Sequence, residues 1–386
     1  MTTEDMGKMA TSGAVIAERR GAVGLITLNR PKALNALSLE MIRDITAALV
    51  AWRDDPLVTL VAVRGTNKVG KPGTAESLFG NFCAGGDIRF FHEAALAGDK
   101  SLDDFFTEEY RLNFLIQTYP KAYVTFLDGV VMGGGMGLCQ GGQHPLRIAT
   151  ERTKMAMPET NIGLFPDVGG GYFLSRCPGH VGEYLAMTGE VIGADAAMAY
   201  GLADIKLASS SLPALWQGLG TPGLGSVGEI RAWISGQDDS QRSDSAPQAA
   251  QSVPDRARVD SYFSLARVKH IVDALEASDD IWAKKTAVVL RKRSPLMLHV
   301  ALEQVRRARS MSLADELRME RVMVHQCFYS RPPAESETVE GIRALAVDKD
   351  YSPKWKPARI DDVKPAMINA FFESPWAPAA HPLADL

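Results

Sequence analysis

The sequence predicts an α/β core followed by a helical region, and two observations support this prediction. From residue 14 to about residue 207, short apolar or β-branched runs alternate with stretches whose apolar residues recur at helical spacing. Beyond residue 256 only the helical spacing continues. Of the 386 residues, 46% are hydrophobic and 23% are charged, a composition that excludes a disordered or collagen-like chain.

Changes in composition divide the chain into four predicted parts. A core with the catalytic site occupies 14–235, and a mobile loop or linker rich in Ser, Gln and Asp occupies 236–256. A helical region follows over 257–357, and an irregular tail containing several prolines covers 358–386.

The first elements of the core are two strands and a helix. The apolar runs 15–19 and 23–28 flank Gly21 and predict a hairpin. Ser38 is placed to cap a helix whose apolar positions extend to Trp52.

The same two periodicities predict the later elements. The continuous apolar runs 58–63 and 123–127 predict strands that are covered on both faces. Helical spacing predicts helices over 88–97, 105–117, 259–275, 281–290, 295–307 and 313–328. In the last of these, the positions expected to face the core are Leu317, Val322, Val324 and Phe328.

Charge and cysteine content narrow the functional class. With 42 basic and 46 acidic residues, the net charge of -4 argues against broad nucleic-acid binding. The four cysteines are far apart and the histidines lack metal-ligand spacing, so neither a zinc site nor a disulfide framework is expected. Residues 1–13 contain acids and no apolar segment, and no apolar run is long enough to span a membrane. We therefore expect a reduced, cytoplasmic protein that needs no metal and does not bind membranes.

Three glycine-rich segments, 82–87, 128–138 and 157–171, are the candidate sites of chemistry. Glycine at a strand-to-helix junction lets the backbone approach a ligand and points N–H groups at negative charge. Two such junctions can form an oxyanion hole for a developing alkoxide. The phosphate-binding motifs GxxxxGK[ST] and strand-GxGxxG-helix are absent from the sequence. Tight packing of helices and sheet is the alternative explanation for each segment.

Two acidic residues of the third segment, Glu159 and Asp167, are candidates for acid–base or nucleophilic catalysis. Both lie beside proline or glycine in apolar surroundings, where burial can separate the pKa values of two carboxyl groups. The alternative is structural: Glu159 would be a first-turn helix acid, and Asp167 would cap a helix that begins near Gly169.

These segments together resemble the crotonase, or enoyl-CoA hydratase/isomerase, superfamily. Its consecutive landmarks match 29–37, 82–87, 133–135 and 158–159. Within it the chain is most similar to the 3-hydroxyisobutyryl-CoA hydrolases. The motifs that carry this similarity are residues 108–110, 157–160, 163–171 and 352–357. The resemblance implies a ClpP/crotonase-like core of ββα units wound in a spiral, with a helical C-terminal region. It also implies an acyl-CoA substrate and permits a homo-oligomer.

The resemblance also implies roles for individual residues. The backbone N–H groups of Gly86 and Gly134 would form the oxyanion hole, Glu159 would be the principal catalytic carboxylate, and Asp167 the second acid. Glu109 and Gly134 correspond to substrate-contacting positions, and Glu159 and Asp167 also lie against the substrate. The segment 32–37 would lie near the CoA nucleotide. Lys68, Lys71, Arg291, Lys292 and Arg293 are candidates for holding the CoA phosphates, and the alternative is that they are solvated surface charges.

The implied reaction is hydrolysis of 3-hydroxyisobutyryl-CoA to 3-hydroxyisobutyrate and CoA, as in valine catabolism, without a metal or redox cofactor. Hydratases of the superfamily carry a second Glu two residues after the glycine triplet, and this chain has Gly137 there. Hydration would therefore lack one acid, whereas an oxyanion hole with Glu159 and Asp167 supplies what thioester hydrolysis needs. An enoyl-CoA hydratase or isomerase, and a non-catalytic acyl-CoA-binding homologue, remain the alternatives.

Overall fold

The computed structural model describes residues 7–9, 11–67, 79–236 and 255–386, which form two compact units. The sheet unit comprises Met1–Gly86, Leu115–Met155 and Val191–Val253, as far as these residues are described. The helical unit comprises Asp87–Phe114, Ala156–Glu190 and Pro254–Leu386, again as far as described. The chain thus enters each unit more than once.

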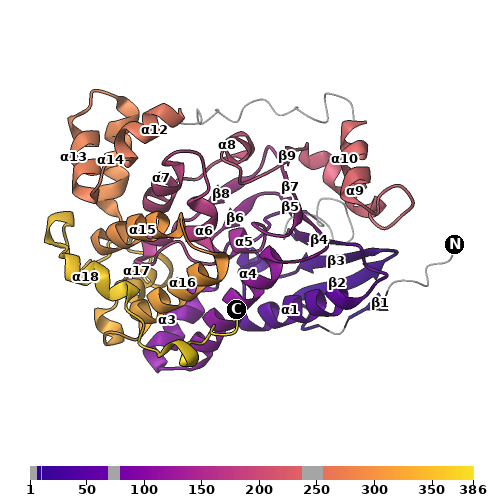
Figure 1. Cartoon of the computed structure of the whole chain (residues 1–386), viewed down its shortest axis with the longest axis horizontal. Helices are drawn as coiled ribbons and strands as arrows, with labels where there is room; N and C mark the ends of the chain where they lie inside the picture. Colours follow the sequence, from indigo (N-terminus) through magenta and orange to yellow (C-terminus); the bar gives the residue numbers. More distant parts are fainter. Residues whose placement is uncertain (1–6, 10, 68–78, 237–254) are drawn as a thin grey trace. The chain divides into compact units, whose positions relative to one another are not determined.

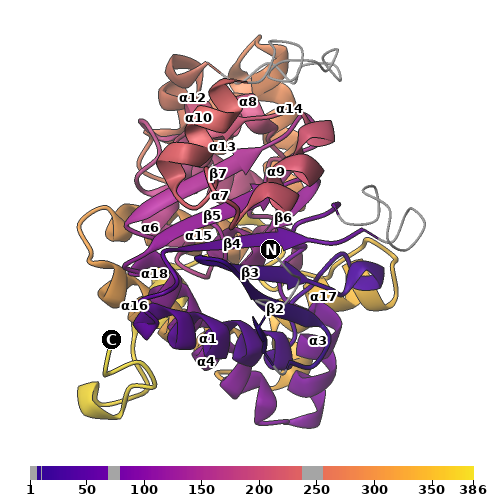
Figure 2. The ribbon, with the colours of Figure 1, turned by 90° about the vertical axis from the view of Figure 1, so that its right-hand side faces the viewer.

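The sheet unit is built on a mixed sheet with the strand order β1-β2-β3-β4-β5-β7-β9. Figure 2 labels the strands of this sheet from β2 to β7. The first three strands pair antiparallel and the others parallel. A second, two-stranded sheet pairs β6 with β8. The strands are β1 Gly7–Lys8, β2 Val15–Arg20, β3 Val23–Leu28, β4 Leu60–Gly65, β5 Ala122–Leu127, β6 Val130–Met132, β7 His144–Ala149, β8 Lys154–Ala156 and β9 Ile205–Lys206.

Helices cover both faces of the large sheet. On one face, α9 (Leu212–Gly218) and α10 (Val227–Ser235) pack on β3, β4, β5 and β7, with Trp216 edge-on to Phe126. On the other face lies α1 (Leu39–Asp54), whose Trp52 leaves no room for a side chain at Gly24. Burial on both faces explains why the central strands are continuously apolar.

The early elements confirm the local predictions. Strands β2 and β3 form the predicted hairpin, and the Ser38 side chain accepts the Met41 N–H at 3.3 Å as the cap of α1. The strand predicted over 58–63 begins later, at Leu60, because Val58 donates its N–H back to Asp55 in a turn.

The helical unit consists mainly of α-helices (Figure 1). Its helices are α3 Ile88–Ala97, the part of α4 (Ser101–Gln117) up to Phe114, α6 Gly170–Leu174, α7 Val181–Thr188, α12 Arg256–Phe263, α13 Val268–Ala277, α14 Ile281–Lys292, α15 Pro295–Ala308, α16 Leu313–Phe328, α17 Glu337–Ile342 and α18 Pro365–Asn369. The sheet unit additionally holds α5 Gly134–Gly137 and α8 Ala194–Ala199. The four apolar residues predicted to face the core from α16 are all buried.

The prediction of one helix over 259–275 is wrong, because the segment forms two helices. Helix α12 ends at Phe263 and α13 begins at Val268. Arg306 of α15 donates to the carbonyls of Phe263, Leu265 and Ala266 at 3.3, 2.7 and 2.8 Å. This arginine binds the carbonyl groups that the break leaves without helical partners, and the local periodicity does not reveal such a distant contact.

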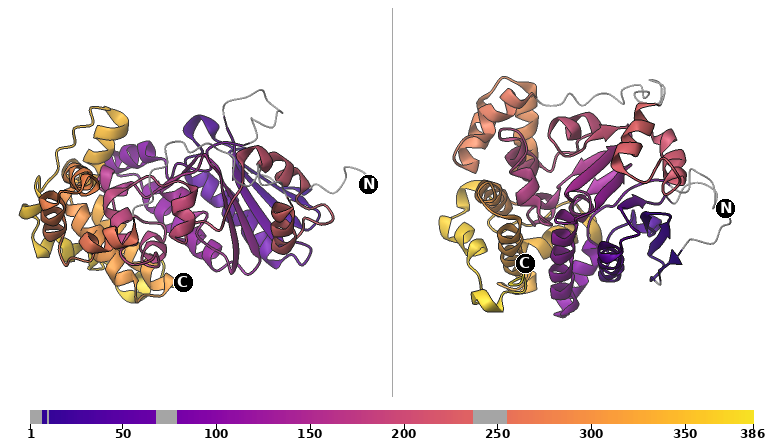
Figure 3. Two further views of the ribbon diagram at one scale, coloured as in Figure 1. Left: turned by 90° about the horizontal axis from the view of Figure 1, so that it is seen from above. Right: turned by 45° about the vertical axis from the view of Figure 1, so that its right-hand side comes forward.

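The segment 358–386, yellow in Figure 3, contacts helices of the helical unit. Arg318 of α16 donates to the Leu383 carbonyl at 3.1 Å, and Arg111 of α4 forms an ion pair with Asp385 at 2.6 Å. The four-part division of the sequence stays a prediction, and its linker lies almost wholly outside the described residues. No helix in the described part of the chain is long and apolar enough to cross a membrane.

Candidate active site

Two glycine-rich loops lie side by side in the sheet unit. The Cys83 N–H donates to Val130 and the Met132 N–H donates back to Cys83, both at 3.0 Å. A Cβ atom on Gly85, which has φ +99°, would lie 3.5 Å from the Gly134 nitrogen. The structure therefore brings together the loops that carry Gly86 and Gly134, as the resemblance implied.

The N–H groups of these two glycines are available to a ligand. Gly134 is the first residue of α5, where a helical N–H has no partner within its own helix. Gly86 forms a bridge with Leu37, in which Leu37 donates to the Gly85 carbonyl at 2.8 Å. Neither the Gly86 N–H nor the Gly134 N–H donates a backbone hydrogen bond to another described residue.

Three acidic side chains gather in the helical unit: Glu109 of α4, Glu159 of a 3-10 helix (Glu159–Ile162), and Asp167 of the loop before α6. They are only 1%, 6% and 5% exposed. The Tyr110 hydroxyl donates to Asp167 Oδ2 at 2.8 Å. One oxygen of Glu109 and one of Glu159 have no hydrogen-bond partner among the described residues.

Burial of these carboxyl groups shifts their acidity. Loss of solvent raises the pKa of Asp167 from 3.8 to about 7, although the hydrogen bond from Tyr110 opposes the rise. Burial, followed by the charge of Asp167, raises the pKa of Glu159 well above its usual value, and the pKa of Glu109 rises for the same reasons. The three groups repel one another as carboxylates, so the site retains protons near neutral pH.

The turn that carries Glu159 is fixed by contacts within the helical unit. The Ser294 N–H donates to the Thr160 carbonyl at 3.1 Å, and the Thr338 hydroxyl donates to the Gly163 carbonyl at 2.6 Å. Gly163 ends the 3-10 helix at φ +68°, where an added Cβ would lie 2.3 Å from the Glu337 carbonyl oxygen. Only glycine fits this position, so the turn cannot shift without moving α17.

The structure agrees in part with the structural role considered for Glu159 and disagrees with the one considered for Asp167. Glu159 does begin a short helix, but its side chain is buried rather than solvated. Asp167 does not cap the next helix: α6 begins at Gly170, and its cap residue, Gly169, provides no side-chain hydrogen bond. The Asp167 carboxylate instead faces Tyr110.

Sequence reasoning missed other polar residues near this cluster. Asn113, one turn after Glu109 on α4, is fully buried, and both its amide atoms lack partners among the described residues. The sequence signal for Asn113 is its spacing of four residues from Glu109, which places both side chains on the same face of a helix. Tyr110 lies within a motif shared with the hydrolases, but the sequence predicted no role for it. Its hydrogen bond to Asp167 joins residues 57 positions apart, which no local pattern reveals.

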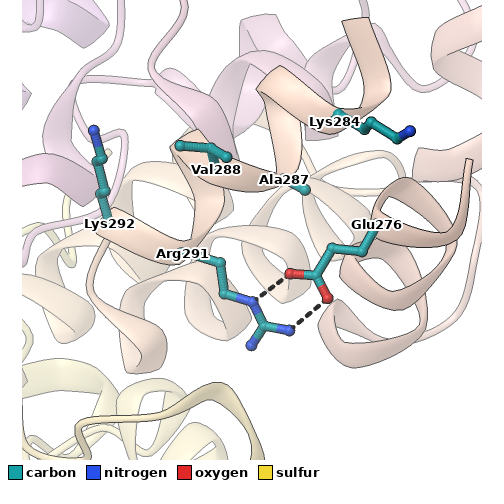
Figure 4. Close-up of a pocket in the computed structure, with 6 residues that line it drawn as sticks. All are labelled: Glu276, Lys284, Ala287, Val288, Arg291 and Lys292. Carbon is teal, nitrogen blue, oxygen red and sulfur yellow. Dashed lines mark hydrogen bonds and ion pairs between the residues drawn. The ribbon is translucent and has the colours of Figure 1, made fainter. Parts of the chain in front are cut away.

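Of the basic residues considered for CoA phosphates, the three that the structure describes are not gathered at the carboxyl groups. A pocket of about 380 Å³ between α13 and α14 is lined by Arg291 and Lys292, but Arg291 is paired there with Glu276 at 2.8 Å (Figure 4). Arg293 donates to the Thr188 carbonyl and to the Asn161 side chain. Lys68 and Lys71 lie outside the described residues. Among the described residues, no group of His, Cys, Asp and Glu is arranged to hold a metal ion.

Comparison with known proteins shows the family to which the chain belongs. A family model described as enoyl-CoA hydratase/isomerase matches residues 23–372. The chain belongs to this family. The predicted crotonase-like fold is thereby confirmed, in agreement with two solved structures.

These structures are titled a carnitinyl-CoA dehydratase from Mycobacterium thermoresistibile and an enoyl-CoA hydratase from Rhodobacter sphaeroides. They are 34% and 33% identical to this chain, each with a TM-score of 0.77. The matches cover 96% and 94% of this chain, and 97% of each solved chain.

Curated relatives identify the subgroup that the chain resembles. A Gallus gallus protein is 38% identical over 93% of this chain and 88% of its own length, and one from Rattus norvegicus is 39% identical over 96% and 91%. Both are named 3-hydroxyisobutyryl-CoA hydrolase, mitochondrial, and 3-hydroxyisobutyryl-CoA hydrolase 1 of Arabidopsis thaliana is 38% identical over 95% and 93%. The predicted similarity to these hydrolases, and hence to an enzyme, is confirmed.

The predicted cytoplasmic location is wrong by the same comparison. The Gallus gallus and Rattus norvegicus relatives are named as mitochondrial proteins, which points to mitochondria instead. The prediction depended on the acids within residues 1–13, and this composition does not reveal the location that the relatives indicate.

Proposed function

We propose that this enzyme hydrolyses 3-hydroxyisobutyryl-CoA to 3-hydroxyisobutyrate and CoA, a step of valine catabolism. The observation that carries the proposal is the buried pair of Glu159 and Asp167, supported by Tyr110, in a family whose members act on acyl-CoA compounds. The names of the curated relatives support the choice of substrate.

The proposal assigns each chemical role to a residue of this chain. The Gly86 and Gly134 N–H groups stabilise the negative charge that develops on the thioester oxygen. Glu159 removes a proton from water as the water oxygen bonds to the carbonyl carbon, or attacks that carbon itself and is then released by water. As the C–S bond breaks, protonated Asp167 gives its proton to the thiolate. Glu109 and Asn113 have polar atoms that lack a partner within the described part of the chain, and these atoms bind the hydroxyl group of the acyl chain.

Gly137 favours hydrolysis over hydration. It is buried within α5 and has no side chain, so it cannot supply the second carboxyl group that hydration uses in this family. The hydratase and dehydratase titles of the solved structures keep hydration as the second candidate function.

Release of thiol from 3-hydroxyisobutyryl-CoA, followed with a chromogenic thiol reagent, tests the proposal. We expect turnover of this thioester and no hydration of crotonyl-CoA. Hydration without thiol release would establish the hydratase alternative, and binding without either reaction would establish a non-catalytic homologue. The proposal includes no metal or redox cofactor, so treatment with EDTA should leave thiol release unchanged. Self-assembly into a homo-oligomer is part of the proposal and is checked by light scattering.

The rate of hydrolysis should depend on pH with a midpoint near neutrality. Since burial raises the pKa of Asp167 to about 7 and that of Glu159 well above its usual value, the pair loses its first proton only near pH 7. Below that pH both groups are protonated and no base is present. Above it the pair keeps one proton, and the reactive form carries this proton on Asp167 with Glu159 ionised. We expect kcat/KM to fall as the pH decreases through an apparent pKa near 7. A midpoint near pH 4, the value of a solvated carboxyl group, would contradict this assignment.

A substitution beside the glycine loops tests the proposed oxyanion hole. A Cβ atom on Gly135 would lie 2.5 Å from the Cys83 carbonyl oxygen, so Gly135→Ala must displace one loop from the other. We expect kcat to fall at least about 10-fold, because loss of one oxyanion donor costs about 10²–10³-fold. Stability should decrease by about 1–3 kcal/mol from overpacking. Gly193→Ala is the control, since its nearest neighbour lies 4.0 Å away and its φ is -88°; equal losses in both variants would refute the assignment.

A further inference from the structure

The loop that carries Asp167 has a backbone conformation that its residues do not favour. The backbone carbonyl of Asp167 accepts the Gly170 N–H at 2.8 Å, which closes a turn through Val168 and Gly169. Both central residues are left-handed, with φ values of +59° for Val168 and +82° for Gly169. Glycine adopts this conformation freely, but a β-branched residue does so only rarely. The surrounding structure must therefore hold Val168 in place.

Two buried side chains bind this turn on both sides of Asp167. Glu320 of α16 accepts the Gly169 N–H at 2.8 Å and the Gly171 N–H at 3.2 Å. Gln304 of α15 donates to the Pro166 carbonyl at 2.7 Å and to Glu320 at 3.0 Å. Glu320 and Gln304 are both 0% exposed, so water does not compete for these bonds.

A second acid, Glu316, lies one turn before Glu320 on α16 and is also 0% exposed. Written as a carboxylate it has no partner for either oxygen among the described residues. Two adjacent buried carboxyl groups share a proton more readily than they carry two charges. Glu320 already accepts three N–H groups, so the shared proton belongs on Glu316, which then donates to Glu320. Burial raises the pKa of both groups, of Glu320 well above its usual value and of Glu316 to about 7, which agrees with one proton retained by the pair; its place on Glu316 follows from the three N–H groups that Glu320 accepts.

Two of the three glycines at the start of α6, Gly169 and Gly171, are accounted for by this arrangement. A Cβ atom on Gly171 would lie 2.2 Å from Glu316 Oε1 and 3.0 Å from Gln304 Nε2. Gly169 has the left-handed φ already described. These glycines therefore allow the side chains of Glu316 and Glu320 to approach the backbone closely, and flexibility is not needed to explain them. The other ionisable groups that interact with the pair are Asp167, Tyr110 and Arg176.

We propose that Glu320, supported by Gln304 and by a protonated Glu316, is a positioning residue that clamps the left-handed turn and thereby orients Asp167. The inference rests on the proposed function, because it acts through the catalytic role of Asp167. Glu320 itself touches the backbone of the loop and does not touch the substrate.

The test compares Glu320→Gln with Glu316→Gln. A glutamine at 320 keeps one acceptor but presents an NH2 group to the remaining N–H donors, so the turn is released. We expect kcat to fall about 10- to 100-fold with KM changed less than about threefold, the cost of misplacing a catalytic group by about 1 Å. A glutamine at 316 supplies a permanent donor to Glu320, so this variant should keep at least a third of the wild-type kcat. Equal damage from the two substitutions would overturn the clamp.

A double-mutant cycle shows whether Glu320 acts through Asp167. In an Asp167→Asn background, Glu320→Gln should lower kcat less than about threefold further, because the group that it positions is already gone. If the loss of kcat in the double variant equals the product of the losses in the two single variants, the proposal is overturned. Should Glu320→Gln fail to fold, Gln304→Met replaces it in the same cycle, with an expected loss of about 3- to 10-fold alone and the same non-additivity.

Failure of the clamp and failure of the proposed function give different results. If the wild-type enzyme releases no thiol, or Asp167→Asn is fully active, the proposed function fails. A crystal structure of Glu320→Gln then still decides the structural claim: a shift of Val168 to negative φ supports the clamp, and an unchanged turn overturns it. If Asp167→Asn is inactive while Glu320→Gln is fully active, the clamp alone fails.

Discussion

Replacement of Glu159 by glutamine should lower kcat for 3-hydroxyisobutyryl-CoA hydrolysis by at least about 10²–10⁴-fold, the usual contribution of a general base. The amide can neither accept a proton from water nor attack the thioester. The turn around it should persist, because it is held by backbone and hydroxyl contacts from Ser294 and Thr338 that do not involve the carboxylate. We therefore expect a folded and inactive enzyme with a thermal midpoint no lower than that of the wild type.

Glu276→Gln is the matched control for this experiment. It makes the same chemical change at an exposed acid that pairs with Arg291, outside the carboxyl cluster. Its kcat should equal that of the wild type. If Glu159→Gln retains full activity, Glu159 has no part in the mechanism. A single turnover in H₂¹⁸O also separates the two routes, since ¹⁸O recovered in the Glu159 side chain identifies this residue as the nucleophile.

Asp167→Asn should lose activity and gain stability in the same protein. As a general acid its contribution to kcat is about 10²–10⁴-fold. Its stability effect follows from burial, which raises its pKa from 3.8 to about 7. The folded state therefore holds a proton that the unfolded state releases, and stability falls as the pH rises from about 4 to about 7. At pH 8 the pair of Asp167 and Glu159 has lost one of its two protons and carries one buried charge, so the whole penalty is present, up to about 4 kcal/mol as an order of magnitude.

Urea unfolding of the wild type and of Asp167→Asn at pH 8 and pH 5 measures this effect. The asparagine still accepts the Tyr110 hydroxyl but carries no buried charge, so its gain should be large at pH 8 and much smaller at pH 5. A loss of stability at pH 8 would show that contacts of the carboxylate outweigh its desolvation. The expected combination means that the enzyme retains a destabilising group for its chemistry.

Much of the fold is predictable because its signals are local. The cap at Ser38, the hairpin of β2 and β3, and helix α3 over Ile88–Ala97 were located from residues within a few positions of each other. Predictions failed where a distant residue decides the local structure. The break between α12 and α13 is stabilised by Arg306, which lies about 40 positions further along the chain.

The candidate site divides in the same way. Matched words in the sequence singled out Gly86, Gly134, Glu159 and Asp167, and the structure confirms that the two glycine loops are adjacent and that the two acids are buried. Their catalytic roles stay predictions. The motifs did not show what surrounds Asp167, because Glu320, which binds the Gly169 N–H, lies 151 positions from it in the sequence.

By itself the sequence determined the family, the order of the early elements and the residue types that the chemistry needs. These depend on motifs and periodicities that are complete within short segments. Only the tertiary structure decided how strongly the acids are perturbed and which groups hold them. A pKa shift requires removal of water from all sides of a carboxyl group, and a clamp requires helices from distant parts of the chain to meet at one turn.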